Sequence, residues 1–164
     1  MICVTVGTHE QQFDRLVAYM DQWAGTQDEE VIIQTGYSKV VPQNCKWRSF
    51  YRQHEMDDFI RNARIVVTHG GPCCYIEVLK LGKIPIVVPR RHMYGEHVDD
   101  HQFEIGKRLQ EARNNIVLIE DINKLGYALE NYDEITKTMN HTTPDLPDED
   151  FCRKFSGIVD TLFE

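Results

Sequence analysis

A histidine followed by two glycines lies near the middle of the chain, between an apolar run and a segment with helical spacing. These residues are His69, Gly70 and Gly71. An imidazole can donate a hydrogen bond to a phosphate oxygen, and glycines let a ligand approach the backbone closely. A helix that begins directly after the turn adds free N–H groups and the positive end of its dipole. The pattern favours a phosphate-binding turn over the alternative, in which His69 only closes the end of a strand.

A single carboxylate follows within the expected helix. Glu77 lies eight residues after His69, in a segment that is otherwise apolar. A carboxylate near the start of such a helix can accept hydrogen bonds from the two hydroxyls of a ribose. A solvent-facing position on the helix explains Glu77 equally well. The spacing alone leaves both interpretations open.

A second polar cluster spans residues 96–102, with the sequence Glu-His-Val-Asp-Asp-His-Gln. His97 and His101 are four residues apart, so on a helix they would share a face and could ligate a metal ion. A zinc peptidase would need a glutamate directly after the first histidine, where Val98 stands. The acidic residues suit sugar hydroxyls equally well. We therefore expect no metal and no cofactor.

Two adjacent cysteines, Cys73 and Cys74, lie at the expected start of the helix. A helix N-terminus favours the thiolate, which would suit a nucleophile. A cysteine phosphatase, however, would need an arginine where this chain has Leu79 and Lys80. The chain has five cysteines, an odd and scattered set that indicates free thiols in a reducing compartment. We interpret the adjacent pair as small residues tolerated near a phosphate.

The elements that must position these residues alternate between strands and helices. Strands are expected at residues 2–6, 31–34, 47–51, 65–67, 84–88 and 116–119. Helices are expected at residues 13–23, 56–62, 73–81, 98–110, 121–131 and 149–163, with Asp121 as an N-cap. The alternation predicts an α/β fold with a Rossmann-like, mostly parallel sheet and flanking helices.

Ligands of such sheets bind at the carboxyl ends of the strands. Three polar turns are expected to meet there, at residues 7–11, 35–38 and 69–74. The long polar loop at residues 89–100 is expected to form a wall of the same site. The chemistry-bearing residues of the two polar clusters would then share one crevice.

Length and composition limit the class of protein. The 164 residues suit one domain, and 41% hydrophobic and 27% charged residues are typical of a soluble globular chain. No apolar run approaches the roughly 20 residues needed to span a bilayer. The N-terminus enters a strand without a basic leader, so a cytoplasmic protein is expected.

The net charge of −8 is unevenly placed. Residues 120–164 hold 11 acidic and 4 basic residues, so the rest of the chain is close to neutral. Basic residues near the expected site are Arg90 and Arg91, but neither half of the chain carries a basic stripe. This distribution argues against a nucleic-acid partner.

Several segments together carry a family resemblance. They are residues 4–11, 34–38, 67–71 followed by Glu77, and 95–102. The histidine–glycine turn with its later glutamate resembles the donor-binding motif of GT-B glycosyltransferases that use UDP-sugars. Residues 1–131 as a whole resemble the C-terminal domain of glycosyltransferase family 28. The similarity extends to the stand-alone bacterial subunits of capsule and exopolysaccharide synthesis, the PssE type.

The resemblance implies roles for individual residues. It assigns to the diphosphate of the donor Gly7, Thr8, His69, Gly71 and Cys74, with Gly70 in the same glycine turn. It assigns Glu77 to the ribose, and to the sugar Asp100, His101 and Gln102. Such motifs usually carry serine or asparagine where this chain has the cysteine pair. A thiol is a weak donor, so backbone N–H groups must carry more of the phosphate contact.

The resemblance also implies a second chain. A GT-B enzyme needs two Rossmann-like domains, and 164 residues provide room for one. The family solves this by pairing with a membrane-anchored, acceptor-binding subunit, as does the similar dolichol-pathway transferase that adds the second N-acetylglucosamine. We therefore expect a donor-binding domain at residues 1–131, a linker at 132–147 and an interface helix at 148–164. That helix would contact the membrane subunit, or a second copy when the chain is isolated.

The expected function is the UDP-sugar-binding subunit of a two-component, inverting, metal-independent glycosyltransferase. It would transfer a hexose, galactose, to a lipid-linked saccharide at the inner face of the plasma membrane. Inversion needs a base to deprotonate the acceptor, and His9 is the residue of this chain proposed for it, unless the partner supplies one. Two alternatives are a non-catalytic stabilising or stimulating subunit and a nucleotide-sugar epimerase, although the epimerase would need two domains.

Overall fold

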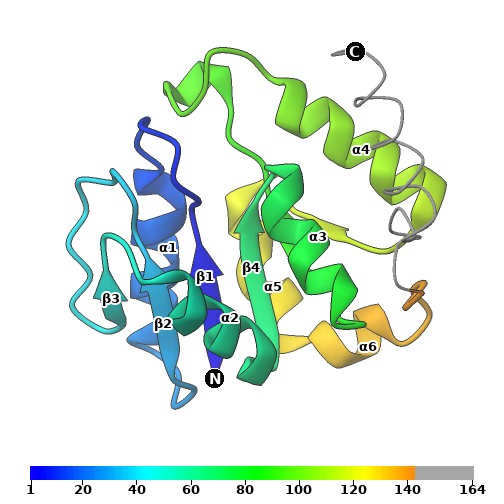
Figure 1. The fold of residues 1–164 in the computed structure, drawn as a ribbon, viewed down its shortest axis with the longest axis horizontal. Coiled ribbons are helices and arrows are strands. Elements are labelled where there is room, and N and C mark those ends of the chain that lie inside the picture. Colours follow the sequence, from blue (N-terminus) through cyan, green and yellow to red (C-terminus); the bar gives the residue numbers. More distant parts are fainter. Residues whose placement is uncertain (143–164) are drawn as a thin grey trace, which may run out of the picture.

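The computed structural model describes residues 1–142 of the chain. Six parallel strands form one sheet, in the order β3-β2-β1-β4-β5-β6. Their bounds are Ile2–Thr5 (β1), Val31–Gln34 (β2), Lys46–Arg48 (β3), Ile65–His69 (β4), Ile86–Val88 (β5) and Val117–Leu118 (β6). The predicted Rossmann-like parallel sheet is therefore confirmed (Figure 1). The direction in which the chain adds strands reverses between β1 and β4, and a crevice is expected at that point.

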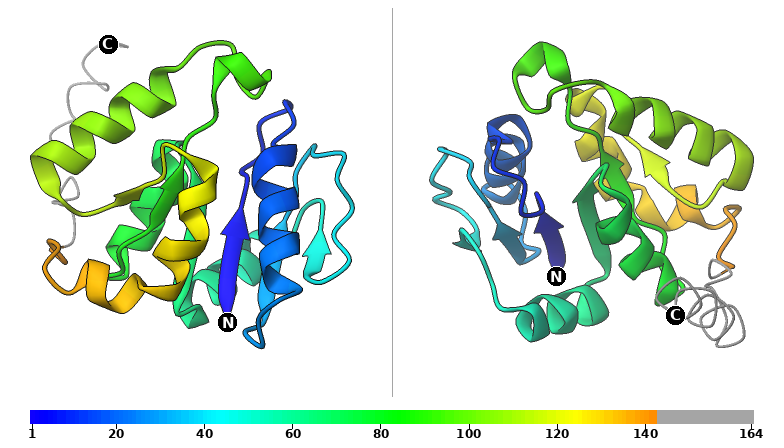
Figure 2. Two further views of the ribbon diagram at one scale, coloured as in Figure 1. Left: turned by 180° about the vertical axis from the view of Figure 1, so that it is seen from behind. Right: turned by 45° about the horizontal axis from the view of Figure 1, so that its top comes forward.

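Helices cover both faces of the sheet. Their bounds are Asp14–Ala24 (α1), Gln53–Asn62 (α2), Pro72–Lys80 (α3), His101–Arg113 (α4), Leu125–Glu130 (α5) and Tyr132–Thr136 (α6). Short 3₁₀ turns occupy His92–Tyr94 (η1) and Ile122–Lys124 (η2). Helices α1 and α5 pack on one face, while α2, α3 and α4 pack on the other (Figures 1 and 2).

The central strands are apolar on both sides because both faces of the sheet are covered. Strands β1 and β4 are buried along their whole length. Val4 and Val67 pack toward α1 and α5, whereas Cys3 and Val66 pack toward α2. Burial raises the pKa of the Cys3 thiol to about 12, so it remains neutral in the core. Within the described residues the four cysteines are free thiols, as the sequence indicated.

Several predicted elements differ from those observed. The predicted linker at residues 132–147 was wrong for its first part, because Tyr132–Thr136 forms α6. Tyr132 is buried and its hydroxyl donates to the carbonyl of Ile84 at 2.6 Å, which holds this segment against the residues that lead into β5. The predicted helix at 121–131 is divided into η2 and α5, although Asp121 caps it as expected by accepting from the N–H of Asn123 at 3.0 Å.

The helix predicted to begin at Val98 begins instead at His101. The preceding residues form turns because their side chains bond to one another and to the loop backbone, which competes with helix formation. The predicted terminal helix at 149–163 lies outside the described residues. None of the helices within residues 1–142 is long and apolar enough to cross a membrane.

Candidate functional site

A cavity of about 470 Å³ opens at the carboxyl ends of β1 and β4, where the strand order reverses. This volume is in the range of small-molecule sites. The cavity is lined by the turns after β1 and β4, the first turns of α3 and the segment that enters α2. The lining residues include Gly7, Thr8, His9, Phe50, Tyr51, His69, Gly71, Cys73, Cys74 and Glu77.

Seven of the predicted site residues therefore line one cavity, including the three from the turn after β1. Four others do not line it, namely Gly70, Asp100, His101 and Gln102. The turn at residues 35–38 does not line it either, because it packs against the start of α1, where the Ser38 hydroxyl accepts from the N–H of Phe13 at 3.0 Å. The loop at 89–100, expected as a wall, also lies outside the lining.

The ring of His69 is enclosed by the two glycine-bearing turns. A β-carbon on Gly7 would lie 2.5 Å from the ring, and one on Gly71 would lie 2.4 Å from it. Gly7 also has φ +75°, a conformation that favours glycine. Both positions thus require glycine for the imidazole to fit, which gives the glycine turn a steric role beside the expected approach of a ligand.

His69 is a neutral histidine. Its side chain is 7% exposed, and burial lowers its pKa to about 4, with smaller contributions from the charge of Arg90 and from His9 and His97. A neutral imidazole keeps one N–H to donate. The Nδ1 atom is buried and has no hydrogen-bond partner among the described residues. A buried polar atom without a partner is costly, and the residue also lines the cavity, so the imidazole of His69 is the group of this turn that can contact a ligand.

The N-terminus of α3 is directed by the same turn. Gly71 is the N-cap residue, Pro72 follows it, and no side chain caps the helix. The first amide groups of a helix have no partner within the helix, and its dipole is positive at this end. The uncapped start of α3 and the imidazole of His69 therefore come together at one wall of the cavity. This wall is suited to an anion.

Farther along α3 the cavity wall carries an acidic side chain. This is Glu77, which is exposed on α3 and lines the cavity. Cys74 lies one turn earlier, and burial raises the pKa of its thiol to about 11, which keeps it neutral. A neutral thiol next to the helix start adds no repulsion toward an anion. The carboxylate of Glu77 is placed to accept hydrogen bonds from hydroxyl groups.

An aromatic wall faces this one and was not predicted from the sequence. Phe50 and Tyr51 line the cavity, and Phe50 is 44% exposed. The position of Tyr51 is held by its N–H, which donates to the side chain of Gln34 at 3.1 Å. The only signal in the sequence is an aromatic pair at the end of the strand expected at residues 47–51; the observed β3 ends at Arg48, before the pair. A planar, apolar ligand group could stack at this wall.

Arg90 is fully buried beside the cavity and is the main structural residue that the sequence did not reveal. Its guanidinium donates to the carbonyls of Val6 at 2.8 Å and of Gln11 and Gln12 at 2.9 Å each. Burial lowers its pKa to about 10, which leaves it charged at neutral pH. Arg90 therefore fastens the turn after β1 to the end of β5. Its charge also makes the surroundings of His69 more favourable to an anion.

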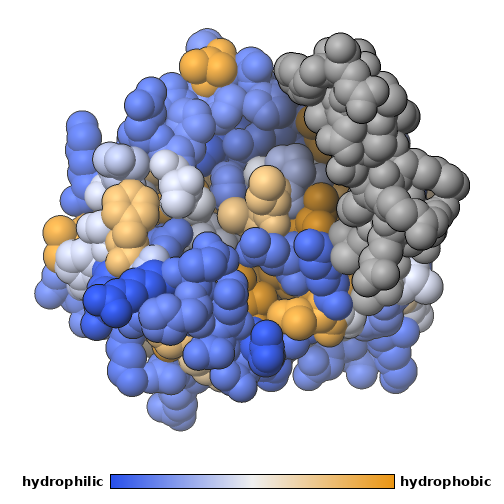
Figure 3. All heavy atoms as spheres, viewed as in Figure 1, coloured by the Kyte–Doolittle hydropathy of each residue, from blue (hydrophilic) through white to orange (hydrophobic). Residues whose placement is uncertain are grey.

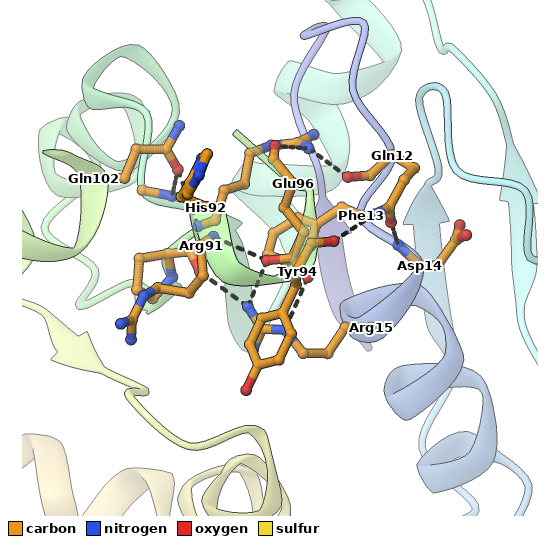
Figure 4. A network of polar contacts seen from close by, with 12 residues as sticks. Gln12, Phe13, Asp14, Arg15, Arg91, His92, Tyr94, Glu96 and Gln102 are labelled. Atoms are coloured by element: carbon orange, nitrogen blue, oxygen red, sulfur yellow. Dashed lines mark hydrogen bonds and ion pairs between the residues drawn. The ribbon is translucent and has the colours of Figure 1, made fainter. Parts of the chain in front are cut away.

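The polar loop after β5 is held in place by ion pairs and hydrogen bonds that its charged side chains make (Figure 4). Glu96 is buried and pairs with Arg15 at 2.9 Å, and it accepts from the N–H of Arg91 at 3.0 Å. Asp100 accepts from the Arg91 side chain and from the N–H of His92, each at 3.0 Å. These bonds lower the pKa of the Asp100 carboxyl, the largest cause being the bond from the His92 backbone.

Gln102 joins this loop to the glycine turn. Its side-chain oxygen accepts from the N–H of Gly70 at 3.1 Å and from the N–H of Arg90 at 3.2 Å. A β-carbon on Gly70 would lie 2.7 Å from Gln102. The amide oxygen of Gln102 is thus used within the protein, and only its NH₂ group remains for another partner. Gln102 therefore holds the turns after β4 and β5 next to each other.

A row of histidines leads from the cavity to this loop. The ring centroids of His9 and His97 are 5.0 Å apart, and those of His97 and His101 are 4.7 Å apart. His9 lines the cavity, and its Nδ1 accepts from the N–H of Gln11 at 3.2 Å. In the neutral ring the proton of His9 is therefore on Nε2, as assigned from this bond. His9 is arranged to donate through Nε2.

Comparison with known proteins agrees with this fold. Residues 1–143 match the model of the glycosyltransferase family 28 C-terminal domain. The UDP-N-acetylglucosamine transferase subunit ALG13 of Homo sapiens is 31% identical over 119 residues, which are 66% of this chain and 10% of that protein. Its Mus musculus counterpart is 32% identical over 117 residues, 65% of this chain and 10% of that protein. The chain spans about a tenth of the length of the curated relatives it matches.

Proposed function

The chain belongs to the glycosyltransferase family 28 C-terminal domain family, and we propose that it is the donor-binding subunit of a glycosyltransferase that uses a UDP-sugar. The observation that carries this proposal is the wall made by the uncapped start of α3 and the imidazole of His69, which line the cavity together. A diphosphate can accept hydrogen bonds from both. The relatives are named as subunits of a UDP-N-acetylglucosamine transferase, which supports a UDP-linked donor.

The groups that line the cavity follow one another in an order that suits the parts of a nucleotide. The diphosphate lies at the start of α3, where Gly7, Thr8 and Gly71 let it approach the backbone. The ribose hydroxyls bond to Glu77 on the same helix. The base then lies against Phe50 and Tyr51, since these are the aromatic residues of the lining. Cys74 adds little to this contact, because its N–H already donates to the carbonyl of Gly71 at 3.1 Å and its thiol is a weak donor.

The sugar extends from the diphosphate toward the loop that carries Asp100, His101 and Gln102. Asp100 and Gln102 already bond within the protein, through one carboxylate oxygen and the amide oxygen respectively. They can still offer the second carboxylate oxygen and the NH₂ group to sugar hydroxyls. We propose a hexose, with galactose as the first sugar to test.

The proposed reaction is an inverting transfer in which the leaving diphosphate needs no divalent ion. Charge on the leaving group is stabilised by the dipole of α3, by the N–H of His69 and by the buried charge of Arg90. His9 can act as the base only after its proton moves from Nε2 to Nδ1, which breaks the bond from Gln11. A base on the partner chain requires no such change.

The acceptor is proposed to be a lipid-linked saccharide of capsule or exopolysaccharide synthesis, held by a membrane-anchored partner at the inner face of the plasma membrane. A separate acceptor half is consistent with the apolar residues exposed on the loops at the carboxyl edge of the sheet. They lie on both sides of the cavity, after β2 and β3 and after β5, and are Tyr37, Phe50, Met93, Tyr94 and Val98. In Figure 3 the face viewed is mostly hydrophilic, with hydrophobic residues in separate patches.

The proposal is tested by thermal shift with a panel of UDP-sugars, with and without a co-expressed partner. Stabilisation by UDP and by one UDP-sugar is expected with the single chain, and sugar transfer only with the partner present. Absence of any shift with UDP would contradict donor binding. Transfer that survives Glu77→Ala unchanged would instead support the non-catalytic, stimulating subunit.

The partner contact is tested separately. We propose that residues 148–164, outside the described residues, contact the partner, or a second copy in its absence. Deletion of residues 144–164 should abolish co-purification and transfer while UDP binding persists. A shortened chain that still co-purifies would place the contact elsewhere. One that fails to fold would show that the segment belongs to the core of this domain.

A further inference from the structure

Three metal-ligating side chains converge outside the cavity, on the loop that precedes α4. His97, Asp99 and His101 each offer one ligand atom, and these atoms all lie within 4.8 Å of one another. His97 Nδ1 is 3.1 Å from Asp99 Oδ1, and His101 Nδ1 contacts the same oxygen. We propose, in place of the absence of a metal expected from the sequence, that these three residues bind a divalent transition-metal ion, with Zn²⁺ as the ion that fits best.

The chemistry of the three ligands selects the class of ion. Two imidazole nitrogens and one carboxylate oxygen suit Zn²⁺ and its first-row neighbours, whereas Mg²⁺ and Ca²⁺ prefer oxygen alone. An ion placed among the three atoms replaces the shared hydrogen bonds on Asp99 Oδ1. Each ring then carries its proton on Nε2, so no proton has to be lost from the cluster.

Exposure indicates how the coordination is completed. The His97 side chain is 9% exposed, while Asp99 and His101 are 56% and 45% exposed. The cluster is therefore closed on one side and open to solvent on the other. Water can occupy the fourth position of a tetrahedral ion that has three protein ligands.

The loop is held before any ion binds, which lowers the cost of ordering the ligands. The His92 ring contacts the carbonyl of His97 at 3.3 Å, and Asp100 bonds to Arg91 and to the His92 backbone. Glu96, directly before His97, is anchored by Arg15. These contacts hold the backbone of the loop on which the three ligands lie.

The proposed ion lies outside the cavity that takes the diphosphate, ribose and base, although its ligand His101 is also a residue proposed to contact the sugar. His97, Asp99 and His101 do not line the cavity, and the link to it is the ring of His9, whose centroid is 5.0 Å from that of His97. The ion would therefore fix the loop beside His9 without contacting the leaving diphosphate. Metal-independent transfer chemistry and a bound structural ion are compatible.

Isothermal titration of the full chain with ZnCl₂, in a non-chelating buffer with a phosphine reductant, tests the proposal. One ion per chain is expected, with a dissociation constant of about 10 µM or lower. Asp99→Ala and His101→Ala should each weaken binding at least about tenfold. Both side chains are largely exposed, so the variants should fold, which circular dichroism and UDP binding can verify.

Matched controls separate this site from other ligands of zinc. His54→Ala removes an exposed histidine of α2, and Cys73→Ala removes an exposed thiol; both should leave the titration unchanged. The Co²⁺-loaded chain should show no thiolate charge-transfer band. The proposal is overturned if Zn²⁺ does not bind, if Asp99→Ala and His101→Ala titrate like the parent, or if Cys73→Ala abolishes binding. In the last two cases the three side chains form only a hydrogen-bonded cluster.

Discussion

His69 and Gly71 occupy adjoining space in the wall of the cavity, so that a β-carbon on Gly71 would lie 2.4 Å from His69 Nε2. The φ of Gly71 is −75°, a value that any residue can adopt. The requirement for glycine at this position is therefore imposed by the imidazole of another residue. This contact couples the shape of the glycine turn to the position of the histidine.

Gly71→Ala should displace the His69 ring, lower the free energy of unfolding by about 1–3 kcal/mol and weaken UDP binding. Urea unfolding and UDP titration measure the two effects. The double variant His69→Ala/Gly71→Ala removes the clash, so adding Gly71→Ala to His69→Ala should cost little stability. Equal costs of Gly71→Ala in both backgrounds would show that the ring does not impose the glycine.

The pKa of His69 predicts an acid-sensitive stability. The folded-state pKa is about 4 and the ordinary value is 6.5, so between these values the unfolded chain binds a proton that the folded chain does not. The contribution of neutral His69 is fully present above about pH 6.5 and is lost as the pH falls toward 4, by at most about 3 kcal/mol.

Urea unfolding of the parent and of His69→Gln at pH 7, 5.5 and 4.5 measures this contribution. Glutamine cannot titrate, and the carboxylates that also lose stability in acid, such as Glu29 and Asp100, are common to both proteins. The parent should lose more stability than the variant over this range. Parallel pH curves would show that His69 is not buried as a neutral ring.

Glu77→Ala should weaken UDP binding at least about tenfold while the fold is kept, because a charged acceptor of hydrogen bonds is worth about 1.5–3 kcal/mol per bond. Titration with UDP and a uridine analogue without ribose hydroxyls measures the effect, and the analogue should not distinguish parent from variant. Glu111→Ala, at an exposed glutamate of α4, is the matched control. Superimposable UDP titrations of Glu77→Ala and the parent would make Glu77 a simple surface residue.

UDP should raise the melting temperature, whereas NAD at the same concentration should not. An NAD-binding sheet of this strand order ends its second strand with an acidic residue for the adenosine ribose. Here β2 ends at Gln34, whose side-chain oxygen is already bonded to the N–H of Tyr51. Thermal shift with both nucleotides provides the comparison, and equal stabilisation would contradict the proposed donor class.

Local patterns determined the fold. Apolar runs alternate with helical spacing along the chain, and this order alone indicates parallel strands joined by helices. The histidine–glycine turn and Glu77 are also close in sequence, so the strand, turn and helix that carry them could be predicted together. The start of α3, three residues after the strand-ending His69, follows from Pro72, which is favourable in the first turn of a helix.

Long-range packing decided the rest of the site. Arg90 reaches the carbonyl of Val6 across 84 residues of sequence, and Tyr51 reaches Gln34 across 17. Nothing in the composition around Arg90 distinguishes a buried arginine from an exposed basic residue. Only the closure of β5 against the turn after β1 supplies the carbonyls that allow its burial.

The loop before α4 shows the same limit most clearly. Four-residue spacing predicted His97 and His101 on one helix face, yet the helix begins at His101. The two rings still meet, because the Nδ1 atoms of both contact Asp99 Oδ1. Sequence periodicity describes what neighbouring residues can do with their own backbone. Which side chains share an oxygen, a cavity wall or a buried charge depends on segments that only the folded sheet brings together.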